Sequence, residues 1–222
     1  MFVGRLFQHY DIQTGMDYNI RHLKDDPDDC EFVGRMLYEA VTGEYDTLFS
    51  GSSVKTILQF ATSRFRHQPK QYYKNVFLLS SGKQRIGFVE LAFHDTVKCK
   101  GSLIDLVKTF GIRDGCRYLL SRVFFVFPIA PSAAYIDNLA VEEKFRCQGY
   151  GKTLLQRAEE EAVTRKCNKI YLLVFSSNSH AMKFYEKNGY MSVGKPKTYF
   201  GFLYLVTKIP ALVTYEKVLD AP

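Results

Sequence analysis

The sequence predicts a mixed α/β domain, of the α+β type, with a central sheet flanked by helices. Two observations lead to this fold class. Segments with apolar residues at helical spacing alternate with short apolar runs of strand length, and no repeat or low-complexity tract interrupts them. In addition, 222 residues with 46% hydrophobic content, among them 18 Phe and 15 Tyr, suffice for a packed core. Residues 1–15 are interpreted as an N-terminal arm and residues 16–222 as a single domain.

Two amphipathic helices are predicted in the N-terminal half, after a first strand at Tyr18–Leu23. Apolar side chains repeat at helical spacing over Cys30–Val41, and the acidic, proline-containing turn Asp25–Asp29 suits the start of that helix. A second helix is expected to begin after a capping serine, Ser52 or Ser53.

A hairpin and a long connection follow these helices. Val76–Leu79 and Arg85–Phe93 are predicted strands, and the turn signal Ser-Gly-Lys at residues 81–83 joins them. Residues 94–131 are unusually long for a connection between adjacent strands. Their apolar spacing predicts two short helices with a break near Gly111–Gly115.

The C-terminal half is expected to alternate strands and helices. The predicted elements are the strand Tyr135–Val141, a helix over about residues 149–166, the strand Lys169–Phe175, the helix Ser179–Asn188, and the strands Tyr190–Val193 and Leu212–Val218. Phe200–Val206 is either a strand or a loop.

Composition narrows the class of function. The formal net charge of +7 favours an anionic partner, but without a long basic run nucleic acid is not required. No apolar run is long enough for a membrane span, and the N-terminus lacks a signal-peptide pattern. The five cysteines form no C-x-x-C pair, so neither a metal site nor a disulfide framework is predicted, and we expect reduced cysteines in a cytoplasmic protein.

The most informative stretch is RCQGYG at residues 146–151, between a predicted strand and a predicted helix. The first amides of a helix have no internal partner and attract anions, and Arg146 and Lys152 add positive charge beside them. The dinucleotide fingerprint G-x-G-x-x-G is absent, and a P-loop would need glycine where Arg146 stands. The remaining pattern is R-x-x-G-x-G, which predicts a site for a phosphorylated cofactor.

Two blocks carry a specific resemblance. IDNLAVEEKFRCQGYGKTLLQRAEEEA (136–162) resembles the acetyl-CoA-binding motif of the GNAT N-acetyltransferase superfamily, and NSHAMKFYEKNGY (178–190) resembles that family's N-x-x-A-x-x-x-Y-x-x-x-G-[FY] segment. The resemblance implies a GNAT-like central mixed, mostly antiparallel, twisted sheet, with a helical insertion, residues 94–131, between the third and fourth strands. It also implies an N-acetyltransferase that uses acetyl-CoA as co-substrate and needs no metal.

The resemblance assigns roles to individual residues. The implied cofactor-binding residues are Leu139, Ala140, Val141, Arg146, Cys147, Gln148, Gly149, Tyr150, Gly151, Lys152, Asn178, Ala181 and Tyr185. The first three would pair through their backbone with the pantetheine arm, because the family's equivalent strand splays from its neighbour. Residues 146–152 would hold the pyrophosphate. Asn178 would bond the pantetheine, or cap a helix together with Ser179, and Tyr185 would protonate the leaving thiolate, or serve as a core aromatic.

Asp137 is the first candidate for the general base and Glu90 the second, although each could simply be hydrogen-bonded within the sheet. Deprotonating a lysine-like amine at pH 7 costs roughly 4.6 kcal/mol, against about 1.4 kcal/mol for an α-amine, so the former needs a base more. Strand alternation predicts Tyr135, Asp137 and Leu139 on one face of their strand.

The acceptor remains open at this level. It is an amine-bearing small molecule or a protein amine, and an aminoacyl-tRNA is an alternative suggested by the net charge. A non-catalytic acyl-CoA sensor or interaction module is the other alternative. We expect residues 94–131 to lie over or beside the acceptor pocket, or to form an oligomer contact such as that of a homodimer.

Overall fold

The computed structural model describes residues 7–10, 17–40, 46, 48–97, 103–123, 128–197 and 211–219. Within these residues the strands form one eight-stranded sheet, in the order β1-β2-β3-β4-β5-β6-β8-β7. The strands are β1 (Phe7–Tyr10), β2 (Asp17–His22), β3 (Val76–Ser81), β4 (Gln84–Ala92), β5 (Ala133–Val141), β6 (Lys169–Phe175), β7 (Met191–Lys197) and β8 (Leu212–Val218). The β5–β6 pair is parallel and the other recorded pairs are antiparallel, which confirms the predicted fold class.

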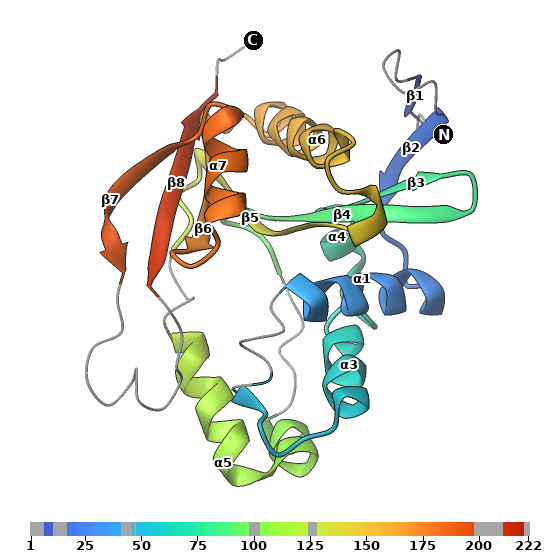
Figure 1. The fold of residues 1–222 in the computed structure, drawn as a ribbon, viewed down its shortest axis with the longest axis vertical. Coiled ribbons are helices and arrows are strands. Elements are labelled where there is room, and N and C mark those ends of the chain that lie inside the picture. The colour runs from blue at the N-terminus through green and yellow to red at the C-terminus, as the bar shows by residue number, and fades with distance from the viewer. Residues whose placement is uncertain are drawn as a thin grey trace.

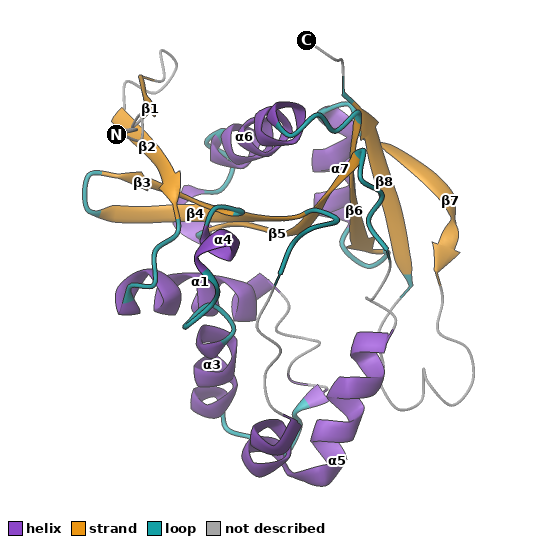
Figure 2. Cartoon of the chain, turned by 180° about the vertical axis from the view of Figure 1, so that it is seen from behind, coloured by secondary structure: helices purple, strands orange, loops and turns teal. Residues whose placement is uncertain are grey.

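The helices lie on both faces of this sheet (Figure 1). They are α1 (Pro27–Ala40), α3 (Val54–Ser63), α4 (Lys70–Tyr73), α5 (Leu103–Val123), the 3₁₀ turn η1 (Glu143–Phe145), α6 (Tyr150–Thr164) and α7 (Ser179–Lys187). One core cluster joins the sheet to α6 and α7, and a second joins its other face to α1, α3 and α4. In Figure 2, β3, β4 and β5 run between these two layers.

The helix starts follow from local hydrogen bonds. The Asp26 carboxylate accepts from the amides of Asp28 and Asp29 at 3.1 Å, in the acidic turn that was predicted to open α1. Ser53 caps α3, because its Oγ accepts from the Thr56 amide at 3.2 Å. The capping serine predicted from the sequence is therefore confirmed as Ser53.

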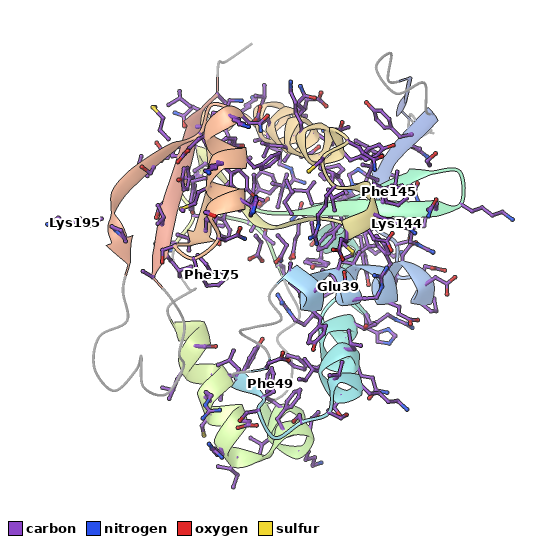
Figure 3. All side chains as sticks on the ribbon, viewed as in Figure 1. Glu39, Phe49, Lys144, Phe145, Phe175 and Lys195 are labelled. Carbon is purple, nitrogen blue, oxygen red and sulfur yellow. The ribbon has the colours of Figure 1, made fainter. Side chains whose placement is uncertain are left out.

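The long connection between β4 and β5 contains α5, whose helical path is broken at Gly111. Gly111 has φ 76° and ψ 169°, a backbone conformation that side chains with a Cβ rarely adopt. An aromatic cluster holds α5 against α3: the Phe49 ring stacks on Phe110 with centroids 3.9 Å apart and lies 5.6 Å from Phe60. Figure 3 labels Phe49 between these helices. The two predicted helices with a glycine break agree with this geometry.

Three elements were not predicted, and one of them is the short 3₁₀ turn η1. Phe7–Tyr10, interpreted as part of an arm, pairs antiparallel with β2 as the edge strand β1. Helix α4 has only four residues, too few for a periodic signal. The rest of the arm (residues 1–6 and 11–16) and the uncertain segment Phe200–Val206 lie outside the described residues.

A buried ion cluster ties α1 to the sheet. Asp29 is 1% exposed, and its carboxylate accepts from both Nη atoms of Arg21 (2.7 and 2.9 Å) and from Nε of Arg85 (2.8 Å). Burial by itself would raise the pKa of the Asp29 carboxyl, but the two guanidinium groups outweigh it and the pKa lies below its ordinary value. The cluster connects α1 with β2 and β4.

We expect Asp29→Asn to lower the free energy of unfolding at pH 7 by about 2 kcal/mol, because it leaves buried donors without a charged acceptor. A carboxyl with a depressed folded-state pKa stabilises the fold above its unfolded pKa, and this contribution disappears as the pH falls through the folded value. Urea unfolding at pH 7 and at successively lower pH should therefore show the difference from wild type shrinking in acid. Asp28→Asn, which changes an exposed neighbour, serves as the control and should have little effect at any pH.

Candidate active site

The parallel strands β5 and β6 separate halfway along their length. Their pairing runs from Ala133↔Lys169 to Ile136↔Leu172. Beyond that point β5 continues beside β4 as far as Val141, whereas β6 continues beside β8 as far as Phe175. The backbone of β5 after Ile136 therefore faces an opening instead of a neighbouring strand, and an extended ligand with amide groups can pair with such an edge.

A cleft occupies this opening, and we call it the β5–β6 cleft. Its described lining consists of Leu37, Ala40, Leu48, Arg64, Tyr118, Ser121, Tyr135, Ile136, Asp137, Asn138, Leu139, Leu172, Leu173, Val174, Phe175, Asn178, Ala181, Tyr185 and Leu212. One wall comes from β5, another from β6 and α7, and a third from α1, from Arg64 at the end of α3 and from α5. The expected position of the 94–131 segment beside a pocket agrees with the presence of two α5 residues, Tyr118 and Ser121, in this lining.

A β-bulge marks the point where the two strands separate. The β4–β5 register steps from Glu90↔Asn138 to Leu91↔Ile136, so two residues of β5, including Asp137, correspond to a single step of β4. Ile136 and Leu139 consequently contact the same core beneath α6, although an unbroken alternation would place them on opposite faces. The predicted grouping of Leu139 with Tyr135 and Asp137 on one face was wrong for this reason.

The loop at residues 146–151 lies at the far end of β5. The Nε atom of Arg146 donates to the carbonyl oxygen of Val141 at 3.1 Å, which anchors the exposed guanidinium beside the strand end. Cys147 and Gly149 have left-handed backbones with φ of 62° and 90°. Left-handed residues beside right-handed ones turn successive N–H groups toward one point, which is the geometry of anion-binding nests. In Figure 3, Lys144 and Phe145 mark the turn that leads into this loop.

Helix α6 presents its first turn to the same loop. Its hydrogen-bond ladder begins with the Thr153 amide, which donates to the Gly149 carbonyl at 3.1 Å. The amides that precede a helical ladder are the donors that a helix offers to an anion. Lys152 is exposed in this turn, and the Phe184 ring of α7 packs beside Gly151. The loop thus has the donors and charges that suit a pyrophosphate.

Helix α7 brings three predicted residues to the cleft. Asn178 caps the helix, because its Oδ1 accepts from the Ala181 amide at 3.0 Å. The exposed side chain keeps an Nδ2 group that can donate to a ligand, so capping and ligand binding are compatible. Tyr185 is 8% exposed, and its ring lies 5.6 Å from that of Tyr190. Burial raises the pKa of Tyr185, so its hydroxyl stays protonated at neutral pH and can donate.

The two carboxylates proposed as bases differ in position. Asp137 and the adjacent Asn138 line the cleft. Glu90 is fully buried in β4, where its oxygens accept from the Tyr72 hydroxyl at 2.9 Å and from the Asn138 amide group at 2.6 Å. Burial, followed by the nearby Glu90 charge, raises the pKa of Tyr72, which keeps this hydroxyl a donor.

Several residues of this site were missed by sequence reasoning. Tyr72, Arg64 and Tyr118 come from segments far apart in the chain, and only tertiary packing brings them to the cleft or behind it. The only sequence signal for Tyr72 was its position between a predicted helix and a predicted strand. Asn138 was visible in the motif block, but its bond to Glu90 depends on the strand register.

Two features are absent from the part of the chain that the structure describes. No group of three or more His, Cys, Asp or Glu side chains there could hold a metal ion. None of the helices described has both the length and the apolar character that crossing a bilayer requires.

Three curated proteins show local sequence similarity. A spermine/spermidine N(1)-acetyltransferase from Bacillus subtilis is 31% identical over 62 residues, which cover 28% of this chain and 41% of that protein. An N-alpha-acetyltransferase 60 from Danio rerio is 37% identical over 67 residues, 29% of this chain and 28% of that protein. A ribosomal protein bS18 alanine N-acetyltransferase from Haemophilus ducreyi is 27% identical over 124 residues, which cover 52% of this chain and 81% of that protein. The chain thus spans less than half the length of the first two relatives.

Solved structures share the fold. An N-acetyltransferase from Staphylococcus aureus superposes with a TM-score of 0.61 at 14% identity, covering 89% of this chain and 99% of that one. An acetyltransferase from Salmonella typhimurium, solved with its cofactor acetyl-CoA, superposes with a TM-score of 0.52 at 14% identity, covering 91% and 94%. At these identities the likeness concerns the fold alone.

A family model decides the assignment. The model described as the acetyltransferase (GNAT) family matches residues 36–190, well over half of the chain. This range includes the β5–β6 cleft residues from Leu37 to Tyr185, the loop at residues 146–151 and helix α7. The predicted resemblance is therefore confirmed, and the chain belongs to the GNAT acetyltransferase family.

Proposed function

We propose that this protein is an N-acetyltransferase that transfers the acetyl group of acetyl-CoA to a primary amine by direct attack in a ternary complex. The observation that carries the proposal is the separation of β5 from β6. It opens a strand edge that leads from the buried Tyr185 and the carboxylate of Asp137 to the anion-binding loop at the start of α6. A long cofactor with amides along its arm and a pyrophosphate at its end matches this order of groups.

The residues of the cleft fit acetyl-CoA in three places. The backbone of residues 139–141 offers amide and carbonyl groups to the pantetheine arm. The amides of residues 147–152, with Arg146 and Lys152, suit the pyrophosphate. The small side chain of Ala181 leaves room one helical turn before Tyr185.

The reaction requires two proton movements, and two side chains of the cleft suit them. Acetyl-CoA, when bound, supplies an acetyl thioester whose carbonyl carbon accepts the amine nitrogen and whose C–S bond then breaks. The carboxylate of Asp137 takes the proton that the amine loses. The hydroxyl of Tyr185, kept protonated by burial, gives its proton to the departing sulfur. The products are an amide and a thiol. The amine has given one proton to Asp137 and the thiol has received one from Tyr185, so the number of protons is conserved.

The acceptor side of the cleft is formed by α1, by Arg64 at the end of α3 and by α5. Its described lining mixes the apolar residues Leu37, Ala40 and Leu48 with the polar residues Arg64, Tyr118 and Ser121, and β5 adds one carboxylate, Asp137. A polyamine has several positive charges that would favour several carboxylates. The lining therefore favours an acceptor with a single amine next to apolar atoms, either a small molecule or the terminal amine of a protein.

Arg146→Glu should weaken acetyl-CoA binding about tenfold or more, because it replaces a charge-assisted donor to phosphate with a repulsive carboxylate. Isothermal titration calorimetry of the full chain measures this directly. Lys55→Glu makes the same change of charge at an exposed site on α3 and should leave the affinity unchanged. Wild-type protein that binds no acetyl-CoA would refute the proposed function.

Tyr185→Phe should lower kcat about a hundredfold while leaving acetyl-CoA affinity unchanged, because it removes the proposed proton donor and little of the ring packing. The assay is release of the CoA thiol with a panel of amines, including a polyamine, an apolar monoamine and a peptide with a free N-terminus. Tyr215→Phe is the matched control, because Tyr215 packs 6.4 Å from the Tyr185 ring and bonds Glu186 outside the cleft.

Two outcomes of this assay separate the alternatives. Full activity of Tyr185→Phe would contradict the proposed acid. Tight binding of acetyl-CoA by the wild type, with no thiol release for any amine of the panel, would favour a sensor of acyl-CoA over an enzyme.

A further inference from the structure

A buried polar cluster lies behind the β5–β6 cleft, on the α1 side of the sheet. Its centre is Glu90 of β4, with 0% exposure. The Tyr72 hydroxyl of α4 donates to Oε1 at 2.9 Å, and the Asn138 amide group of β5 donates to Oε2 at 2.6 Å. A single carboxylate thus joins a short helix and two strands. Burying a charge is unfavourable unless it is hydrogen-bonded, so these two bonds offset part of the cost of burying Glu90.

The cluster is adjacent to the bulge. Glu90 and Asn138 are the last register partners before the step to Leu91 and Ile136. On β5, Asp137 lies between Ile136 and Asn138, the two residues that have partners on β4. A bulge re-aims a side chain, and the contacts on either side of it fix the direction. On one side this contact is the backbone pair of Leu91 and Ile136, and on the other side it is the bond between Glu90 and Asn138.

Glu90 and Asp137 differ in their access to a ligand. Asp137 and Asn138 belong to the described lining of the cleft, and Glu90 and Tyr72 do not. A proton acceptor must come within hydrogen-bond reach of the amine, directly or through one water molecule. Both oxygens of Glu90 accept hydrogen bonds from protein groups behind the strand, whereas Asp137 lies on the wall that a ligand in the cleft would touch.

We infer that Glu90 is a positioning residue for this acetyltransferase, an assignment that rests on the function proposed above. Through Asn138 it holds the β5 bulge in the register that aims Asp137 at the acceptor amine. Tyr72 bonds the other oxygen of Glu90 and so fixes the carboxylate. We call the hydrogen-bonded group Tyr72–Glu90–Asn138 the bracket. The amine proton passes to Asp137, and Glu90 takes no part in the transfer.

Titratable side chains from several elements surround Asp137. Within the described lining they are Arg64 after α3, Tyr118 of α5, Tyr135 of β5 and Tyr185 of α7. Behind the strand lie Tyr72 and Glu90, and Tyr72 feels the charges of Glu90, Arg64 and Asp137 together. A pH profile therefore has to be compared between variants that differ in one of these groups at a time.

The first test is Glu90→Gln. The substitution keeps the shape but replaces a charged acceptor with a neutral amide, so either the Tyr72 hydroxyl has to accept or the Asn138 amide group has to turn over. The charge-assisted bonds are lost and the bulge is held less firmly, so we expect kcat to fall about tenfold, with the KM for acetyl-CoA unchanged. Glu159→Gln is the matched control: Glu159 accepts from the Tyr190 hydroxyl at 3.1 Å and from Lys217 at 2.8 Å on the opposite face of the sheet. It should leave kcat close to the wild-type value.

The decisive test combines Glu90→Gln with Asn138→Asp. The double variant exchanges donor and acceptor between the two positions, since the new amide can donate to the new carboxylate while its oxygen still accepts from Tyr72. We expect kcat to recover at least about tenfold over Glu90→Gln. Adding Asp137→Asn to the double variant should abolish this recovery, and the limb of the pH–rate profile that depends on the base should be lost only when Asp137 is changed.

Two kinetic results would overturn the inference. One is a double variant as inactive as Glu90→Gln while Asp137→Asn alone remains active, because Glu90 would then be the proton acceptor. The other is a triple variant that keeps the recovered activity, because the introduced carboxylate at position 138 would then do the work assigned to Asp137.

An assay without turnover separates failure of the inference from failure of the proposed function. If the wild type acetylates no amine, the function is refuted, and the bracket is judged by amide hydrogen exchange over residues 136–141. The exchange rate there should be at least about tenfold higher in Glu90→Gln than in wild type. In the double variant it should return to the wild-type value. Equal exchange in wild type and Glu90→Gln would show that Glu90 does not hold the bulge.

Discussion

The separation of β5 from β6 at Asp137 is the constraint on which the rest of the site depends. A strand inside a sheet normally pairs with a neighbour on each side. Here the β5–β6 pairing ends at Ile136↔Leu172, while β5 stays paired with β4 and β6 stays paired with β8. The register step opposite Glu90 occurs at the same point. Because the bulge and the opening coincide, the edge left for a ligand and the carboxylate beside it come from one irregularity of the sheet.

The two helical layers support this irregularity from opposite sides. Helices α6 and α7 pack on one face, with Leu154, Ala158 and Tyr185 in one core, and they bring the loop at residues 146–151 and the tyrosine to the opening. On the other face, α1, α3 and α4 share a second core with Phe88 of β4. The buried bonds of Glu90 cross from α4 to β5 within that layer. The loop proposed to bind the cofactor and the carboxylate proposed as the base are thus supported by different layers, which meet at β5.

Sequence reasoning was most reliable where the chemistry is local. The loop at residues 146–151 was recognised from consecutive residues, and Gly149 indeed has the positive φ that such a turn demands. The serine cap of α3 and the helix break at Gly111 were likewise contained in short segments. The face assignment along β5 failed because alternation assumes a regular strand, and nothing in the residues around Asp137 indicates that one of them is extra.

The sequence by itself determined the family, most of the order of helices and strands, and the glycine turn at residues 146–151, because each depends on spacing within one stretch of chain. Only the tertiary structure decided that Glu90 is enclosed by Tyr72 and Asn138 while Asp137 lines the cleft. Residues 72, 90 and 138 are distant in sequence, and their contacts exist only once strand register and helix packing are set. The same reason explains why Tyr118 of α5, far along the chain from α1, shares a wall of the cleft with Leu37.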